Sequence, residues 1–271
     1  MDSYEKLKTA RKNGRPTGGA YVSEIFEFPL EFHGDRRFGD DLAIMGGVAF
    51  LDNRPVTFLA MEKGTDLESR MKRNFGCPKP EGYRKALRLM KQAEKFHRPV
   101  ICFVDTLGAY PGADAEERGQ GQAIAESIIE MMGLKTPVVS VVIGEGGSGG
   151  ALALASANKI FILENAVYSV ISPEGCASIL WKESSQENVA KAADCLHITA
   201  QDMKNFGVAE DIISEDFDHF SEMCKDMKSK LISALDELCA LSEEEVLAQR
   251  YQRFRKFGVF EEKKNGIFKR K

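Results

Sequence analysis

The sequence predicts an α/β fold in which buried parallel strands alternate with helices. Three short apolar runs at residues 99–104, 137–143 and 159–163 support this prediction. Each run has the length of a fully buried strand, and segments with a helical pattern of apolar residues lie between them. Buried strands that alternate with helices require crossover connections, which place the two kinds of element in layers around one sheet.

The segment before these strands begins with a charged helix and a turn-rich stretch at residues 11–19. Residues 21–32 have the composition of a helix, although Pro29 interrupts the pattern. The alternating runs at 44–51 and 56–61, joined by a turn at Asn53-Arg54, predict a hairpin that feeds the sheet.

The helices of the central region are predicted at residues 83–97, 121–132 and 151–157. A long basic loop or irregular helix at 62–80 precedes them. Beyond residue 187 the chain becomes helical and charged, with a helix at 199–207 that Gly207 ends, a segment at 208–213 that follows it, and two helices at 216–241 and 242–257. Ser242-x-x-Glu245 is a capping-box pattern that marks the start of the last helix.

Composition excludes several classes of protein. The 271 residues carry a net charge of −4, so no overall basic field favours nucleic acid. No apolar run reaches the length of a membrane span, and the polar N-terminus lacks a signal peptide, so we expect a cytoplasmic protein without a membrane partner. The six cysteines show no metal-binding spacing, and Cys102 lies in an apolar run that predicts a core residue. We expect the basic tail at 259–271 to be disordered.

The glycine-rich segment Gly144-Glu-Gly-Gly-Ser-Gly-Gly150 follows the second buried strand directly. Five glycines in seven residues predict a turn in which backbone N–H groups are exposed. A strand, a glycine turn and a helix start together form a site for negative charge, because the first N–H groups of a helix lack partners.

The glycine pattern itself leaves four interpretations open. Gly144-x-Gly146-x-x-Gly149, with Glu164 downstream, matches the dinucleotide fingerprint. Gly146-x-Ser148-x-Gly150 matches a nucleophile elbow with Ser148 as the nucleophile. The third interpretation is an oxyanion hole made by main-chain N–H groups. The fourth is a turn that only allows a helix to pack closely on a sheet.

Several long motifs occur together in one order. They are Glu81-Gly-Tyr-Arg-Lys-Ala-Leu-Arg-Leu-Met90, Gly108-Ala-Tyr-Pro-Gly112, the glycine segment, Ser172-Pro-Glu-Gly-Cys-Ala-Ser-Ile-Leu-Trp-Lys182 and Arg250-Tyr-Gln-Arg-Phe-Arg255. Over residues 5–258 the chain resembles the carboxyltransferase alpha subunit of bacterial multi-subunit acetyl-CoA carboxylase. Two positions depart from that family: Leu107 replaces a proline that is common there, and Thr65 replaces a basic residue.

The resemblance implies a crotonase-like fold, a spiral of ββα units with helical N- and C-terminal extensions. We expect one domain over residues 1–258 with its core at about 40–215. The implied reaction moves a carboxyl group from carboxybiotin, presented by a biotin carrier protein, to acetyl-CoA. The product is malonyl-CoA, in the first committed step of fatty acid synthesis.

The resemblance also implies partners. They are a beta subunit that carries a zinc ribbon, in an α2β2 assembly that is active only when both subunits are present, and a biotin carboxylase in the larger complex. No metal is expected on this chain. A carboxyltransferase for another acyl-CoA, a serine hydrolase that uses Ser148 and a scaffold without activity are the alternatives.

The implied site consists of backbone donors. Carboxyl transfer places negative charge on the ureido oxygen of biotin, and fixed N–H groups stabilise such charge without acting as bases. The resemblance gives this role to Gly149 and Gly150, and the beta subunit holds the acetyl-CoA enolate. Gly108, Ala109, Tyr110, Gly147 and Ala151 are expected to line the carboxybiotin pocket. Arg118 and His33 are more simply explained as structural residues, in an ion pair and a hydrogen bond.

Overall fold

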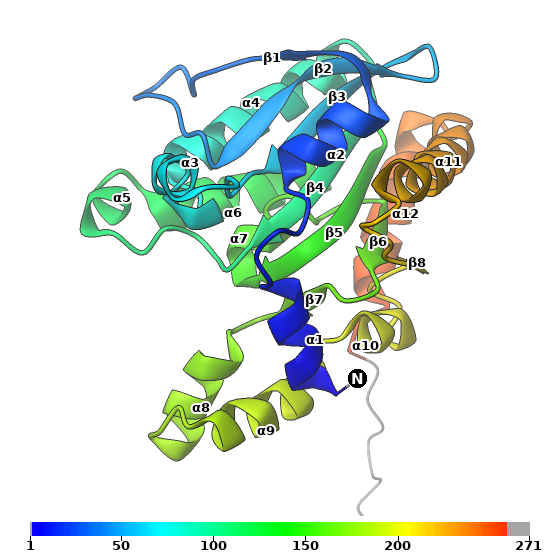
Figure 1. The fold of residues 1–271 in the computed structure, drawn as a ribbon. Coiled ribbons are helices and arrows are strands. Elements are labelled where there is room, and N and C mark those ends of the chain that lie inside the picture. Colours follow the sequence, from blue (N-terminus) through cyan, green and yellow to red (C-terminus); the bar gives the residue numbers. More distant parts are fainter. Residues whose placement is uncertain (1, 259–271) are drawn as a thin grey trace, which may run out of the picture.

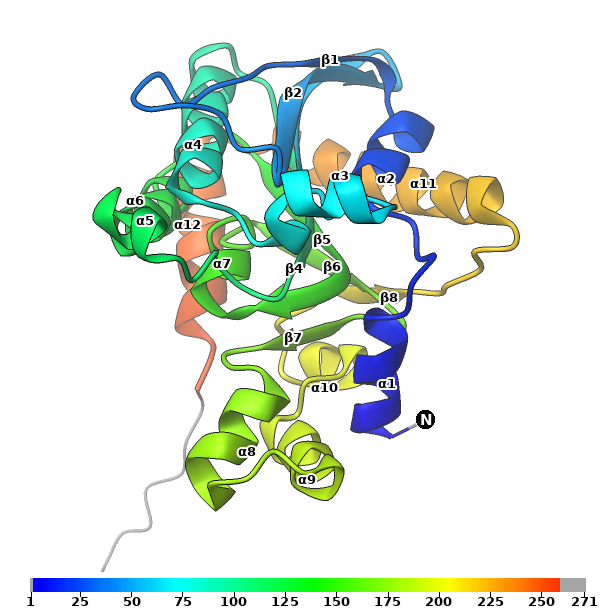
Figure 2. The same cartoon turned by 60° about the vertical axis from the view of Figure 1, so that its left-hand side comes forward.

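One mixed sheet organises the molecule, and helices cover both of its faces (Figures 1 and 2). The computed structural model describes residues 2–258, so the predicted tail at 259–271 lies outside the described residues. The strands follow the order β1-β2-β3-β4-β5-β6-β8, and β7 pairs with β5. Their bounds are β1 (Glu27–Glu31), β2 (Ile44–Leu51), β3 (Arg54–Met61), β4 (Val100–Thr106), β5 (Val138–Gly147), β6 (Lys159–Leu163), β7 (Val167–Ser169) and β8 (Asp211–Ile213).

The first three strands are antiparallel and the rest run parallel, as the three buried runs predict. The hairpin of β2 and β3 is confirmed, with pairs from Ile44↔Met61 to Leu51↔Arg54. Its turn lies at Asp52 and Asn53, one residue earlier than predicted. Both have positive φ, the backbone that a tight hairpin turn requires.

Helices form a layer on each face of the sheet. On one face α4 packs against β2, β3 and α6, and α6 contacts α12; on the other, α2 and α11 pack together over the sheet. The bounds are α1 (Ser3–Ala10), α2 (Gly18–Ile25), α3 (Leu67–Lys72), the 3₁₀ turn η1 (Asn74–Gly76), α4 (Pro80–Lys95), α5 (Ala113–Glu117), α6 (Gln120–Met132), α7 (Ser148–Leu152), α8 (Pro173–Trp181), α9 (Gln186–Leu196), α10 (Ala200–Asn205), α11 (Phe220–Cys239) and α12 (Glu243–Arg255).

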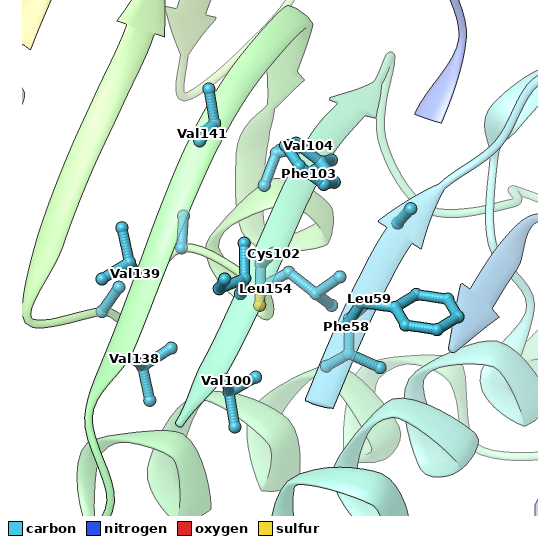
Figure 3. Packing of buried hydrophobic residues seen from close by; sticks show 14 of the residues in the cluster. Phe58, Leu59, Val100, Cys102, Phe103, Val104, Val138, Val139, Val141 and Leu154 are labelled. Carbon is cyan, nitrogen blue, oxygen red and sulfur yellow. The ribbon is translucent and has the colours of Figure 1, made fainter. Parts of the chain in front are cut away.

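The core lies on β4 and β5, where every residue is buried. Figure 3 shows Phe103 and Val104 of β4 beside Val141 of β5, and Phe58 and Leu59 lower down on the neighbouring strand β3. Burial on both faces explains why these strands appear in the sequence as continuous apolar runs. Cys102 is confirmed as a core residue, and burial raises the pKa of its thiol to about 12.

The predicted helix at 21–32 is wrong in its second half. Helix α2 ends at Ile25, and the edge strand β1 begins at Glu27. Phe28 has φ +51°, which breaks any helix, and Pro29 is tolerated because an edge strand leaves some of its N–H positions unpaired.

Helices α8 and α9 form an arm that projects away from the sheet and packs beside α1 (Figures 1 and 2). Two small apolar clusters join these helices: one contains Leu7 of α1 and Ala193 of α9, and the other contains Ala177 of α8 and Ala192 of α9. Arg11, just after α1, links the arm to the sheet. Its guanidinium donates to Glu145 of β5 at 2.7 and 2.8 Å and to Glu174 of α8 at 2.6 Å.

Candidate functional site

The glycine segment is the end of a strand followed by the start of a helix. Strand β5 continues to Gly147, so the predicted turn at 144–150 is wrong in its first half. The strand pairs with β6 through residues 139–142 and with β7 through residues 145–147. Helix α7 begins at once with Ser148, whose φ of +53° supplies the sharp change of direction.

Three of the glycines allow close packing. An added Cβ at Gly144 would stand 2.3 Å from the carboxylate of Asp105, and one at Gly146 would stand 2.2 Å from the ring of Tyr168. At Gly147 it would meet the carbonyl oxygen of Leu107 at 2.1 Å. The packing interpretation therefore accounts for these three positions.

The two remaining glycines differ from each other. A Cβ at Gly150 would lie 2.8 Å from the amide nitrogen of Ala109 and 2.7 Å from the hydroxyl of Tyr83, so Gly150 is also closely packed. A Cβ at Gly149 would meet only a methyl group of Ile124, at an ordinary 3.4 Å. Packing does not require a glycine at 149.

The amides at the start of α7 are available as donors. A helix leaves its first N–H groups without an intrahelical acceptor. Within the described residues, the N–H groups of Gly149 and Gly150 donate to no group outside the helix. Ser148 is exposed and Gly149 half-buried, whereas Gly150 and Ala151 are buried. Gly149 therefore presents the most accessible of the glycine donors.

A cavity of about 340 Å³ opens beside Gly149. Its walls are mostly apolar and come from α7, β6, β7 and the last turn of α12. The larger side chains that line it are Leu152, Ile160, Tyr168, Val170, Val208, Phe254 and Phe257. Backbone donors and an apolar wall thus meet at one place.

Gly108, Ala109 and Tyr110 are predicted to line the carboxybiotin pocket, and the loop that contains them packs against Gly150. Gly108 has φ +146°, and its carbonyl carbon stands 3.1 Å from where a Cβ added to Gly150 would lie. Tyr110 is held by its own N–H, which donates to Pro78 O at 3.0 Å, and by Lys79 Nζ 4.8 Å above its ring. Gly108, Ala109 and Tyr110 therefore adjoin the amides but do not line the apolar cavity.

The serine hydrolase interpretation lacks its base in the part of the chain that the structure describes. Each of the four histidines lies beside a carboxylate on an exposed surface, and none is hydrogen-bonded to Ser148. The dinucleotide interpretation also fails in geometry, because Gly144 and Gly146 lie inside a strand rather than in a turn that approaches a pyrophosphate.

Asp105, which the sequence did not single out, fixes the ends of β4 and β5. It is 4% exposed, and its Oδ1 accepts the N–H of Glu145 at 2.9 Å. Lys63 Nζ lies 2.5 Å from Oδ2. Nothing in the sequence marks this arrangement, because the three residues meet only once the parallel strands are assembled.

Two structural interpretations are confirmed. Arg118 donates to Glu81 at 2.8 Å and to Asp114 at 3.3 Å, and His33 Nδ1 lies 2.9 Å from Asp40.

Across residues 2–258, no helix is long and apolar enough to cross a membrane. The same residues contain no group of three or more His, Cys, Asp or Glu side chains placed to hold a metal ion.

Comparison with known proteins identifies the family. The family model described as "Acetyl co-enzyme A carboxylase carboxyltransferase-like" matches residues 1–258. The acetyl-coenzyme A carboxylase carboxyl transferase subunit alpha of Ruminiclostridium cellulolyticum is 52% identical over 259 residues, which are 96% of this chain and 99% of that protein. The chain belongs to the acetyl-CoA carboxylase carboxyltransferase alpha family.

One further relative and one solved structure are similar to this chain. A Clostridium tetani protein named subunits beta/alpha is 51% identical over 97% of this chain, which spans 46% of that longer protein. The solved structure of transcarboxylase 12S matches with a TM-score of 0.71 and 19% identity, over 96% of this chain and 45% of that one. The chain thus has the predicted crotonase-like α/β fold.

Proposed function

We propose that this chain is the carboxyltransferase alpha subunit of acetyl-CoA carboxylase, and that the N–H groups of Gly149 and Gly150 hold the ureido oxygen of carboxybiotin. Acetyl-CoA would receive the carboxyl group and become malonyl-CoA. The observation that supports this site is Gly149 itself, a glycine that packing does not require at a helix start with free amides.

The surroundings of Gly149 fit the chemistry of a biotin ring. Carboxybiotin supplies the activated carboxyl group. Its ureido carbonyl needs fixed donors, and its bicyclic hydrocarbon and thioether part needs an apolar wall. The amides at the start of α7 and the neighbouring cavity of about 340 Å³ meet both needs. Gly108, Ala109 and Tyr110, with Gly147 and Ala151, do not line this cavity, and we assign them to the opposite wall of the carboxybiotin site, beside Gly150.

The proposed partners follow from the site. The amides of α7 serve one oxyanion, whereas carboxyl transfer also produces an enolate on acetyl-CoA, so a second donor set is needed. We assign that set to a beta subunit in an α2β2 assembly, with a biotin carboxyl carrier protein and a biotin carboxylase in the larger complex. The proposed location is the cytoplasm. The choice of acyl-CoA would depend on the partner, so another acyl-CoA remains the second candidate substrate.

A pair of substitutions at one position tests the proposed donor. Gly149→Pro removes the N–H group at the second residue of α7, where the first turn of a helix tolerates proline. Gly149→Ala adds a similar Cβ and keeps the N–H group. With a beta subunit present, we expect the proline variant to lose about 10²–10³-fold in kcat for malonyl-CoA formation, the usual loss when one oxyanion donor is removed.

The alanine variant is the matched control and should retain activity within about threefold. Size-exclusion chromatography checks that both variants still assemble. Equal activity of two assembled variants would refute the donor role of Gly149, and failure of the wild-type complex to form malonyl-CoA would refute the function. A parallel assay with propionyl-CoA would reveal a different acyl preference.

A further inference from the structure

A second cavity, of about 220 Å³, lies at the carboxyl ends of β4 and β5. It is separate from the apolar cavity beside Gly149 and is lined by the segment after α1, by Lys63 and Arg70, and by the ends of the two strands. Five of its lining side chains are cations and two are anions. Ligands of parallel sheets bind at this edge.

Three of the five cations already have a counter-ion. Arg11 pairs with Glu145 at 2.7 Å, and Lys63 pairs with Asp105. Arg15 donates two hydrogen bonds to Glu215, at 2.7 and 2.8 Å. These three ion pairs lie at the walls of the cavity. Because their positive charges are already neutralised, they add little attraction for an anionic ligand.

Lys12 and Arg70 carry the charge that remains. Arg70 donates only to neutral acceptors, the carbonyl of Gly64 at 3.3 Å and the side chain of Asn13 at 2.9 Å. In the described part of the chain, neither Lys12 nor Arg70 takes part in an ion pair. Two uncompensated cations at one cavity repel each other, and an anion bound between them would remove that repulsion.

Phe75 adds an aromatic surface to the same cavity. Its ring is 52% exposed, and Asn74 and Phe75 both have positive φ, 49° and 54°. A bulky residue in the left-handed region is strained, and such strain persists where the surrounding structure holds it. The backbone thus holds an exposed aromatic ring beside the uncompensated cations, an arrangement that suits a stacked base next to phosphates.

We infer that this cavity binds a phosphorylated nucleotide, with its phosphates on Lys12 and Arg70 and its base against Phe75. Two sources share this chemistry: the nucleotide portion of CoA, and a free nucleotide such as ADP. The inference rests on the cavity itself, and only the CoA source depends on the proposed function.

Calorimetric titration of the full-length chain at low salt tests the inference. The probes are CoA, dephospho-CoA, ADP and pyrophosphate. We expect the double variant Lys12→Gln/Arg70→Gln to bind CoA or ADP at least tenfold more weakly than the wild type. Arg70→Lys should show an intermediate loss, because it keeps the charge but not the planar fork of donors. Phe75→Ala should weaken binding of the nucleotides at least threefold and leave pyrophosphate unchanged.

The matched control is Lys8→Gln/Lys72→Gln. It removes two positive charges from α1 and α3, next to the tested positions, but these lysines pair with Glu5 and Glu68 outside the cavity. We expect less than a twofold change. An equal loss in both double variants would mean that net charge alone attracts the ligand, and this would overturn the inference. Absence of wild-type binding to all four probes at millimolar concentration would also overturn it.

The probes also separate the two sources. Tighter binding of CoA than of dephospho-CoA and ADP assigns the cavity to the CoA nucleotide, and equal or tighter binding of ADP assigns it to a free nucleotide. Because binding is measured on this chain without turnover, a failure of malonyl-CoA synthesis leaves the result intact. The two claims therefore fail independently.

Discussion

At the scale of single residues, the glycines that packing requires look identical in the sequence to Gly149, the proposed donor, which packing does not require. Gly144, Gly146 and Gly147 make room for Asp105, Tyr168 and Leu107. Gly150 makes room for the loop after β4, and only Gly149 lies where a side chain would fit. The partners come from strands and loops far along the chain, so the motif alone does not tell packing glycines from a donor.

Alanine substitutions at the two positions of α7 should therefore have opposite effects on stability. Gly150→Ala forces a Cβ to within 2.8 Å of a backbone nitrogen, and we expect it to cost about 1–3 kcal/mol. Gly149→Ala should be neutral or stabilising, since alanine loses less entropy than glycine in a helix. Thermal unfolding measures both, and a stable Gly150→Ala variant would contradict the packing described here.

At the scale of elements, the strands inside the sheet are predicted best. Strands β2 and β6 have the bounds read from the sequence, and the capping box of Ser242 and Glu245 begins α12 as expected. The apolar pattern and turn residues determine these elements locally. Strand β1 escapes prediction because it is short, contains Pro29 and gains its hydrogen bonds only from β2.

Asp35 organises the loop between β1 and β2. Its carboxylate accepts the N–H groups of Arg37, Phe38 and Gly39 at 2.8–3.0 Å and a hydrogen bond from Arg84 at 2.8 Å. Burial alone would raise the pKa of Asp35, but these hydrogen bonds outweigh it and lower the pKa from 3.8 to about 2. The stabilisation is present above about pH 4 and is lost as the pH falls towards 2.

Asp35→Asn should therefore lower the free energy of unfolding by about 2 kcal/mol at pH 7. The difference from the wild type should shrink as the pH falls from about 4 to about 2, because the carboxyl takes up its proton in the unfolded chain first and in the folded chain only near its pKa of about 2. Urea unfolding at several pH values measures it. Asp218→Asn, at an exposed position, serves as the control. A difference that is independent of pH would show that the charge of Asp35 does not matter.

Arg250 attaches α12 to the rest of the molecule. Its side chain is fully buried and donates to Met131, Leu134 and Thr136 carbonyls at 2.7–2.9 Å and to Asn158 at 2.6 Å. Burial without a carboxylate partner lowers the pKa of Arg250 to about 10. Arg250 of α12 thus donates hydrogen bonds to backbone carbonyl groups at and just after the end of α6. No pattern in the sequence indicates this contact between α6 and α12.

Arg250→Met should destabilise the chain by about 3 kcal/mol, because it leaves several buried carbonyl groups without donors. For a chain of this size we expect a fall in melting temperature of roughly 6–10 °C. The exposed Arg255, in the last turn of the same helix, provides the control variant Arg255→Met. Similar melting temperatures for the two variants would disprove the anchoring role.

At the scale of the whole molecule, the proposed site offers one set of backbone donors for a reaction that creates two oxyanions. Strand β5 is long enough to pair with β6 through its first part and with β7 through its last, and α7 begins directly at its carboxyl end. Of the two proposed donors Gly149 is half-buried and Gly150 is buried, and we propose that a second subunit supplies the other set.

The isolated chain should consequently be inactive. With carboxybiotin and acetyl-CoA but no partner, we expect no malonyl-CoA above the uncatalysed rate, since half of the electrostatic stabilisation is missing. Co-expression with a beta subunit of the same family should restore turnover, and light scattering should give the mass of an α2β2 complex. Wild-type turnover by the chain alone would show that one set of donors is enough, and would remove the need for a second subunit in the reaction.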